Sequence, residues 1–263
     1  MLKKLIKYDL RDSYKILVVF YMLSIFFATL TRIFLYVDNS LIFEVIGKIC
    51  SGTTIAMFFN IIINNMMRLW VRFKTNFYSD ESYLTHTLPV DKKTLYLSKT
   101  LASVITLFTS AIVICLSLFI AYYSKENLLL VKNLLLPLAT VYDSAIVTII
   151  LEFVLVLFLE IMNMLQSGYV GIVLGHMKNN NKTAYSILFG FITYLLTQIF
   201  IIIVIFLVAL FNQDLMNLFF TVDALNVNTI KTCIYLAIFV YTLNIFILYF
   251  VNIKLFNKGV NID

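Results

Sequence analysis

The sequence predicts an all-α integral membrane protein, and three observations lead to this fold class. Of the 263 residues, 62% are hydrophobic and 13% are charged, whereas soluble domains are about half apolar and about a quarter charged. The mean hydropathy is +0.95. Several apolar runs reach the roughly 20 residues that a helix needs to cross a bilayer. We therefore expect a single transmembrane domain over residues 1–263.

Six apolar runs are long enough to form transmembrane helices. They cover residues 16–35, 46–67, 101–122, 144–171, 185–211 and 232–251. The second run is the least apolar, because Lys48, Asn60, Asn64 and Asn65 interrupt it. We do not expect the first run to be a cleavable signal sequence, since it is longer than a typical signal core and no A-x-A-like site follows it.

The segment Met1–Lys15 precedes the first span and alternates apolar residues with lysines and acids. On a helix its apolar residues form one stripe, which predicts an amphipathic interfacial helix. A basic anchor that sets topology is a compatible alternative. The two connections at residues 123–136 and 212–230 are short, and interfacial helices are possible there too.

The basic residues predict that both termini are cytoplasmic. This orientation leaves five of the 20 lysines and arginines on the outer face, namely Arg32, Lys48, Lys125, Lys132 and Lys231. Cytoplasmic segments of membrane proteins carry an excess of such residues. The net charge of +6 fits attraction to anionic lipid better than a nucleic-acid interface.

Between the second and third spans lies the charged interval Arg68–Lys99, which holds six of the 20 basic residues. Phe73, Phe77, Leu84 and Leu88 recur at intervals of 4, 7 and 4, which places them on one helical face. Ser79 is a candidate cap for a helix whose first turn contains Asp80 and Glu81. Pro89 ends the pattern. We expect a short amphipathic helix, a break, and a new helix starting at Lys92.

The fourth span is the most polar. Glu152 and Glu160 are carboxylates within it, and such residues are functional candidates in a membrane. They can line a substrate path or only hydrogen-bond neighbouring helices. Ser167, Gly171 and Gly175 follow at four-residue steps, which favours close helix packing.

The chain lacks the motifs of an enzyme. Gly47 and Gly52 have the spacing of a phosphate-binding loop, but Thr53 stands where the lysine is needed. The two histidines, His86 and His176, do not form an H-E-x-x-H motif, and the three cysteines lack metal-ligand spacing. We expect no catalytic residue, no metal and no cofactor.

The stretch Phe77–Lys99 resembles the loop of ABC-2 type permeases of Gram-positive bacteria. In that family the pattern S-D-E-x-Y-L-T-x-T-L-P-V, followed by basic residues and S-K, lies between spans two and three. The matching residues here are Ser79, Asp80, Glu81, Tyr83, Leu84, Thr85, Thr87, Leu88, Pro89, Val90, Ser98 and Lys99. Looser matches are residues 175–182 and the ending 258–261. Ser82 departs from the family, which often has glycine at this position.

The resemblance implies a multi-pass subunit of the bacterial cell membrane. In such an exporter two permeases, identical or homologous, form the path and two separate ATPase subunits power it. Members near this motif often serve export of antimicrobial peptides or self-protection against them. By this reading Phe77, Asp80, Glu81, Tyr83, Leu84, Leu88 and Pro89 contact the ATPase. The alternatives are a loop that only lies on the lipid, and a non-transporting immunity or scaffold protein that binds a peptide or partner.

Overall fold

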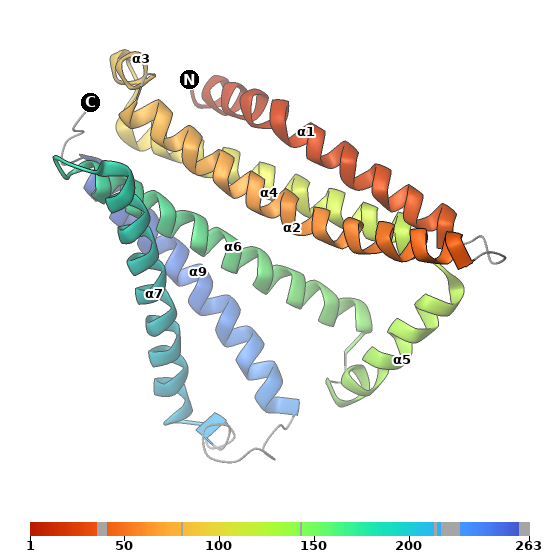
Figure 1. Cartoon of the computed structure of the whole chain (residues 1–263). Coiled ribbons are helices and arrows are strands. Elements are labelled where there is room, and N and C mark those ends of the chain that lie inside the picture. The colour runs from red at the N-terminus through yellow and green to blue at the C-terminus, as the bar shows by residue number, and fades with distance from the viewer. Residues whose placement is uncertain (36–40, 80, 143, 213–214, 217–226, 258–263) are drawn as a thin grey trace. The chain divides into compact units, whose positions relative to one another are not determined.

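The computed structural model describes residues 1–35, 41–79, 81–142, 144–212, 215–216 and 227–257, and these residues are helical with no strands. Figure 1 labels the helices. They are α1 (Leu2–Leu35), α2 (Leu41–Tyr78), α3 (Ser82–Thr87), α4 (Lys92–Tyr122), α5 (Lys125–Tyr142), α6 (Ile146–His176), α7 (Lys182–Ala209) and α9 (Val227–Asn257).

Six of these helices are long and apolar enough to cross a membrane: α1, α2, α4, α6, α7 and residues 229–256 of α9. The predicted number of spans is therefore confirmed. The helices are longer than the apolar runs, because a helix keeps its backbone hydrogen bonds where polar side chains carry it out of the hydrocarbon. Helix α1 begins at Leu2, so the segment predicted to lie at the interface is helical and continuous with the first span.

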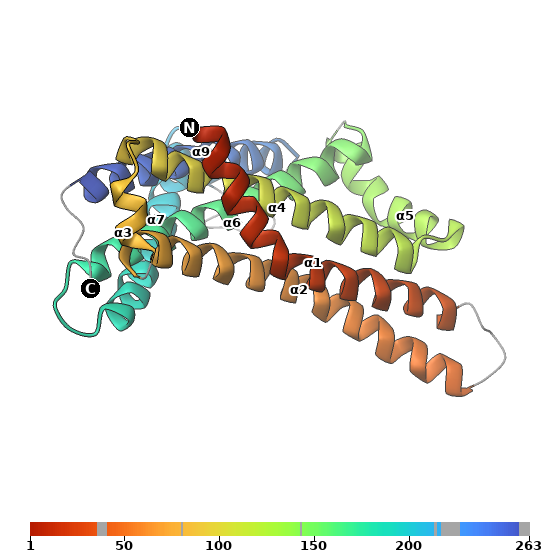
Figure 2. The same ribbon diagram turned by 90° about the horizontal axis from the view of Figure 1, so that it is seen from above.

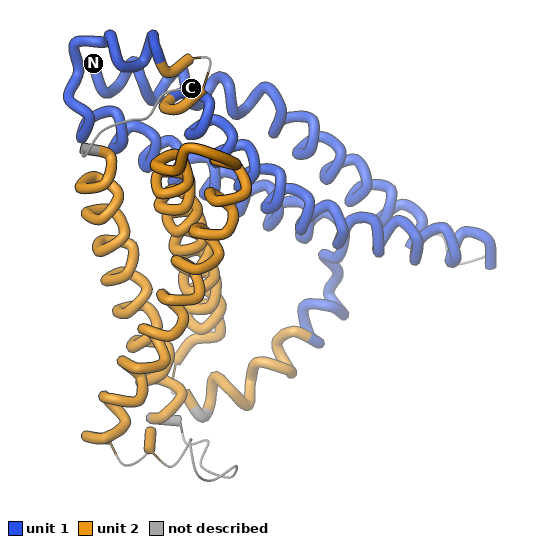
Figure 3. The backbone as a smooth tube through the Cα atoms, turned by 60° about the vertical axis from the view of Figure 1, so that its left-hand side comes forward, with its two compact units in different colours: residues 1–76, 83–130 blue, residues 77–82, 131–263 orange. Residues whose placement is uncertain are grey.

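The helices form two compact units, which Figure 3 colours separately. Unit 1 contains residues 1–76 and 83–130, and unit 2 contains residues 77–82 and 131–263. Each unit has its own internal packing.

In unit 1, α1 packs along α4, and both Figure 1 and Figure 2 show α2 beside them. Leu17, Tyr21 and Ile61 form a buried apolar cluster. Hydroxyl groups join the helices around it. Ser24 donates to Ser117 at 3.0 Å, and Thr31 and Thr54 lie 3.0 Å apart. Such bonds hold helices together where water is absent.

In unit 2, α6 packs against both α7 and α9. Residues 177–181 connect α6 to α7 in a tight turn that ends at Asn181, whose φ of 52° is left-handed. Asparagine tolerates this conformation better than most residues. At the other end of α6, Ala139, Tyr142 and Ile149 form a cluster that packs the end of α5 against the start of α6.

The helix predicted between spans two and three differs from the observed one. We expected one face to carry Phe73, Phe77, Leu84 and Leu88, but α2 continues to Tyr78 and α3 begins only at Ser82. Phe73 and Phe77 thus belong to α2, where both are fully buried. Asp80 and the ending 258–261 lie outside the described residues.

Candidate functional site

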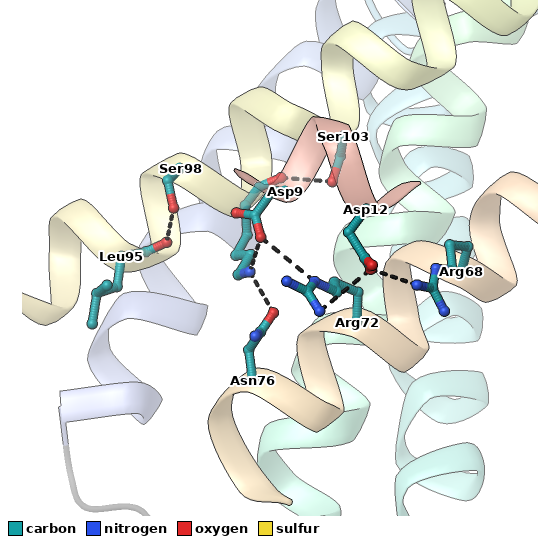
Figure 4. A network of polar contacts seen from close by, with 9 residues as sticks. Asp9, Asp12, Arg68, Arg72, Asn76, Leu95, Ser98 and Ser103 are labelled. Atoms are coloured by element: carbon teal, nitrogen blue, oxygen red, sulfur yellow. Dashed lines mark hydrogen bonds and ion pairs between the residues drawn. The ribbon is translucent and has the colours of Figure 1, made fainter. Parts of the chain in front are cut away.

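Six polar residues of unit 1 form one connected network, which we call the charged clasp (Figure 4). Its members are Asp9 and Asp12 on α1, Arg68, Arg72 and Asn76 on α2, and Lys99 on α4. Asn76 lies six residues before α3 and Lys99 lies twelve residues after it. The clasp therefore joins both helices that flank α3 to α1.

The contacts of the clasp run through its two carboxylates. Asp9 accepts a hydrogen bond from Lys99 and lies 3.7 Å from the Nε of Arg72. Lys99 also donates to the Oδ1 of Asn76 at 2.6 Å. Asp12 accepts from Arg68, and its Oδ2 lies 3.3 Å from the Nη1 of Arg72.

The clasp is largely shielded from solvent. The side chains of Asp9 and Lys99 are 9% and 11% exposed, and that of Arg68, the most open of the charged members, is 25% exposed. Shielded charges are costly unless they are paired. Each carboxylate of the clasp pairs with more than one cation. A substitution that removes one charged side chain therefore leaves the charges of its partners only partly compensated.

Sequence analysis did not identify the clasp. Its signal was present, because Asp9 and Asp12 are three residues apart and Arg68, Arg72 and Asn76 follow at four-residue steps. Each set therefore shares one helical face. What the sequence could not supply was which faces meet.

Helix α3 projects apolar side chains outward. Tyr83 is 74% exposed, Leu84 is 68% exposed and Leu88, just after the helix, is 43% exposed. Pro89 is also exposed, and Glu81 is half-buried. An exposed apolar group on a six-residue helix is the kind of surface that fits a partner groove.

Phe77 does not belong to this exposed set. It is fully buried in unit 2 and packs edge-to-face against Phe256 with ring centroids 4.7 Å apart. The next residue, Tyr78, stacks on the ring of His176 at 4.4 Å. The prediction that Phe77 contacts a soluble partner is therefore wrong, because the end of α9 already covers its side chain.

The two carboxylates of α6 have different surroundings in unit 2. Glu152 accepts a hydrogen bond from the Tyr142 hydroxyl at 2.8 Å. The Nζ of Lys231 lies 4.8 Å from the centre of the Tyr142 ring. Burial, and next the bond to Glu152, raise the pKa of Tyr142, so its hydroxyl stays protonated and donates at neutral pH.

Glu160 lies near the middle of α6 and is surrounded by neutral groups. Its Oε1 accepts from the Tyr194 hydroxyl at 2.6 Å and from the Nε2 of Gln198 at 3.0 Å. Tyr241 on α9 also lies close to this carboxylate. Its Oε2 is buried and has no hydrogen-bond partner in the part of the chain that the structure describes. Helix α6 contains no lysine or arginine, and the lysines of α7 and α9 lie within the first or last five residues of those helices.

The small residues of α6 lie where it meets α7. A Cβ added at Gly171 would lie 2.4 Å from the Cα of Gly190, and one added at Gly175 would lie 2.4 Å from the backbone nitrogen of Ser186. Ser167 is fully buried, and its hydroxyl donates to the carbonyl of Asn163 at 2.9 Å. Sequence analysis did not name Ser186 and Gly190, although their four-residue spacing matches that of Gly171 and Gly175.

Within the described ranges, no group of three or more His, Cys, Asp or Glu side chains could hold a metal ion. Comparisons of the chain with protein-family models, with curated proteins and with solved structures give no match.

Proposed function

We propose that the chain is the membrane-spanning permease subunit of an ATP-binding-cassette exporter in a bacterial cell membrane. A second permease, identical or homologous, completes the path, and two separate ATPase subunits drive it. The cargo we favour is an antimicrobial peptide, exported or removed for self-protection. The observation that carries the proposal is the exposed apolar surface of α3 between two spanning helices.

The connections of α3 make it suitable for receiving a force. Three residues separate it from α2 and four separate it from α4. A chain reaches at most about 3.5 Å per residue, so a displacement of α3 beyond about 15 Å must move the helices that flank it. An ATPase that binds Tyr83, Leu84 and Leu88 and moves α3 would therefore also move α2 and α4.

The charged clasp would pass this movement to α1. Asn76 and Lys99 lie on the two helices next to α3, and Lys99 pairs with Asp9 of α1. When α2 and α4 move together, the ion pairs keep α1 with them. In this mechanism α3 receives the force and unit 1 responds as one body.

The substrate path of this proposal includes Glu160. Its buried Oε2 has no hydrogen-bond partner among the described residues and lies among three spanning helices. Glu152 was proposed with it, but its bond to Tyr142 gives that carboxylate a structural role at the end of α5. We therefore retain Glu160 as the main candidate for the path.

Co-purification tests the coupling role. The proposal predicts an ATPase gene beside the gene of this chain. The two gene products are expressed together, and the ATPase retained after purification is measured. The double variant Leu84→Asp with Leu88→Asp should retain at least tenfold less ATPase than the unsubstituted chain. Leu129→Asp is the matched control, because Leu129 is 58% exposed on the non-spanning helix α5, across one membrane span from α3.

Reconstitution of both proteins in vesicles completes the test. The pair should hydrolyse ATP faster than the ATPase alone, and the double variant should remove this stimulation. Equal ATPase retention by the double variant and the unsubstituted chain would contradict the coupling role of α3. Peptide binding with no associated ATPase would favour the immunity or scaffold alternative instead.

A further inference from the structure

Helix α5 separates its polar and apolar side chains around its axis. At 100° per residue, one side carries Lys125, Glu126, Lys132, Asn133 and Thr140. The opposite side carries Leu128, Leu130, Val131, Leu134, Leu135 and Leu138. Only Leu129 and Leu136 fall on the polar side. One polar residue, Asn127 in the first turn, falls on the apolar side, and its side chain donates to the carbonyl of Tyr122 at 2.8 Å. The helix is thus amphipathic from Leu128 onward.

The apolar face of α5 is not covered by the described parts of the chain. Leu134 is 74% exposed, Leu130 is 59% exposed and Leu128 is 52% exposed. Packing begins only near the end of the helix, where Ala139 and Tyr142 are buried. A row of leucines this open is unstable in water and marks a contact with another apolar phase.

Both ends of α5 are attached to helices that are long and apolar enough to cross a membrane. Two residues separate it from α4 and three separate it from α6. At about 3.5 Å per residue, these connections reach about 7–11 Å. With 18 residues at 1.5 Å each, α5 is about 27 Å long.

These lengths fix the direction of α5. If it stood upright on the membrane, its far end would lie about 27 Å from the surface, beyond the reach of either connection. The apolar start of α6, Ile146–Leu151, would then be drawn out of the hydrocarbon. A helix held at both ends by such short connections must instead lie along the surface.

We infer that α5 binds the lipid surface, with its apolar face among the upper acyl chains and its lysines at the headgroups. Because α4 separates α3 from α5, this is the membrane face opposite α3. After Asn127 in the first turn, its apolar face consists mainly of leucine and valine. Protein–protein hot spots are enriched in Trp, Tyr and Arg and poor in Leu and Val, so this composition suits acyl chains. Its lysines are placed as in other interfacial helices.

Tryptophan quenching by brominated lipids tests this depth. Trp70 is the one tryptophan of the chain, so Trp70→Phe gives a background without that fluorophore. Into it Leu134→Trp is introduced on the apolar face, and Asn133→Trp on the polar face is the matched control. The purified chain is reconstituted in phosphatidylcholine vesicles brominated at carbons 6 and 7, or at carbons 11 and 12.

The shallow bromines should quench Leu134→Trp at least twice as strongly as the deep ones. Asn133→Trp should be quenched no more than half as strongly by the shallow bromines as Leu134→Trp is. Absence of quenching at position 134 would mean that protein or water covers this face, and strongest quenching by the deep bromines would mean that the helix enters the hydrocarbon. Either result would overturn the inference. Leu130→Trp repeats the measurement if Leu134→Trp does not fold, and no ATPase is involved.

Discussion

Both units join long apolar helices by hydrogen bonds between neutral side chains, and among the described residues unit 1 adds a cluster of ion pairs. In unit 1 the charged clasp pairs two carboxylates with three cations. In unit 2 the buried polar groups of α6 meet neutral partners: Asn163 donates to Thr197 at 3.1 Å, and Asn252 donates to the carbonyl of Gln166 at 3.3 Å. In unit 2 the backbones of α6 and α7 also lie close together, at Gly171 and Gly190.

Depth along the helices explains the difference between the clasp and the Asn163–Thr197 bond. Asp9 and Lys99 each lie seven residues from the start of their helix, about 10 Å at 1.5 Å per residue. Near a helix end, charged groups keep some access to water and headgroups, so their desolvation costs less. Asn163 and Thr197 lie deeper along α6 and α7, where neutral hydrogen bonds hold helices together at a lower cost. Glu160 is the exception that needs a functional explanation.

The contact between α6 and α7 should be the most sensitive part of unit 2. Gly171→Ala places a Cβ 2.4 Å from the Cα of Gly190, which is backbone and cannot rotate away. We expect a loss of about 3 kcal/mol, which lowers the midpoint of thermal unfolding in detergent by about 6–12 °C.

Two glycines serve as controls for this substitution. A Cβ at Gly190 would lie no closer than 3.6 Å to any atom, and one at Gly52 would meet nothing within 4 Å. Gly190→Ala should therefore leave the midpoint nearly unchanged. Gly52→Ala should raise it slightly, because alanine is the better helix former. A Gly171→Ala protein as stable as Gly190→Ala would show that the two backbones are further apart.

The charged clasp should give the second largest effect. Asp9→Asn removes the charge that compensates Lys99 and should cost about 2 kcal/mol of unfolding free energy. Lys99→Met in the same protein should recover about half of this loss, because it removes the unpaired cation. Thermal unfolding of both single variants and the double variant measures their coupling.

An exposed ion pair provides the contrast. Lys48 and Glu44 lie 2.7 Å apart, with side chains that are 72% and 60% exposed. Surface pairs of this kind add little stability, so Lys48→Met should not shift the midpoint measurably. Additive effects of Asp9→Asn and Lys99→Met would mean that the clasp residues do not depend on one another.

The same contrast shows how far the sequence determines the structure. Apolar length predicted all six spanning helices, because a span must match the bilayer whatever it packs against. Apolar length could not predict whether the side chain of Phe77 is exposed or buried. Its spacing to Leu84 fits one helical face, but that face is broken between Tyr78 and Ser82.

Partners that are far apart in the chain were also missed. Glu160 was recognisable as a carboxylate in a span, whereas Tyr194 and Gln198 came into view only with the structure. Their four-residue spacing on α7 was a usable signal. Which face of α7 meets α6 becomes known only from the structure, because several faces of α7 carry polar groups.

A single hydroxyl group in unit 1 should have a smaller effect. The Oγ of Ser110 lies 2.7 Å from the Tyr21 hydroxyl and accepts from the Nδ2 of Asn65 at 2.8 Å. Ser110→Ala leaves both groups without this partner and should cost about 1 kcal/mol. Thr29→Ala is the control, because within the described residues Thr29 bonds only the carbonyl of Phe26 in its own helix, and it should leave the unfolding midpoint unchanged. Equal midpoints for the two variants would remove Ser110 from the contacts that join the helices of unit 1.

Glu160→Gln should have the smallest effect on stability. The glutamine Oε1 still accepts from Tyr194 and Gln198, so we expect a change of unfolding free energy within about 0.5 kcal/mol. If the carboxylate serves the substrate path, ATP-dependent peptide export from vesicles falls at least tenfold in the same protein. Glu152→Gln is the matched control on the same helix and should keep export. Normal export by Glu160→Gln would leave this carboxylate with a packing role only, like the other buried polar groups of α6 that hold the helices of unit 2 together.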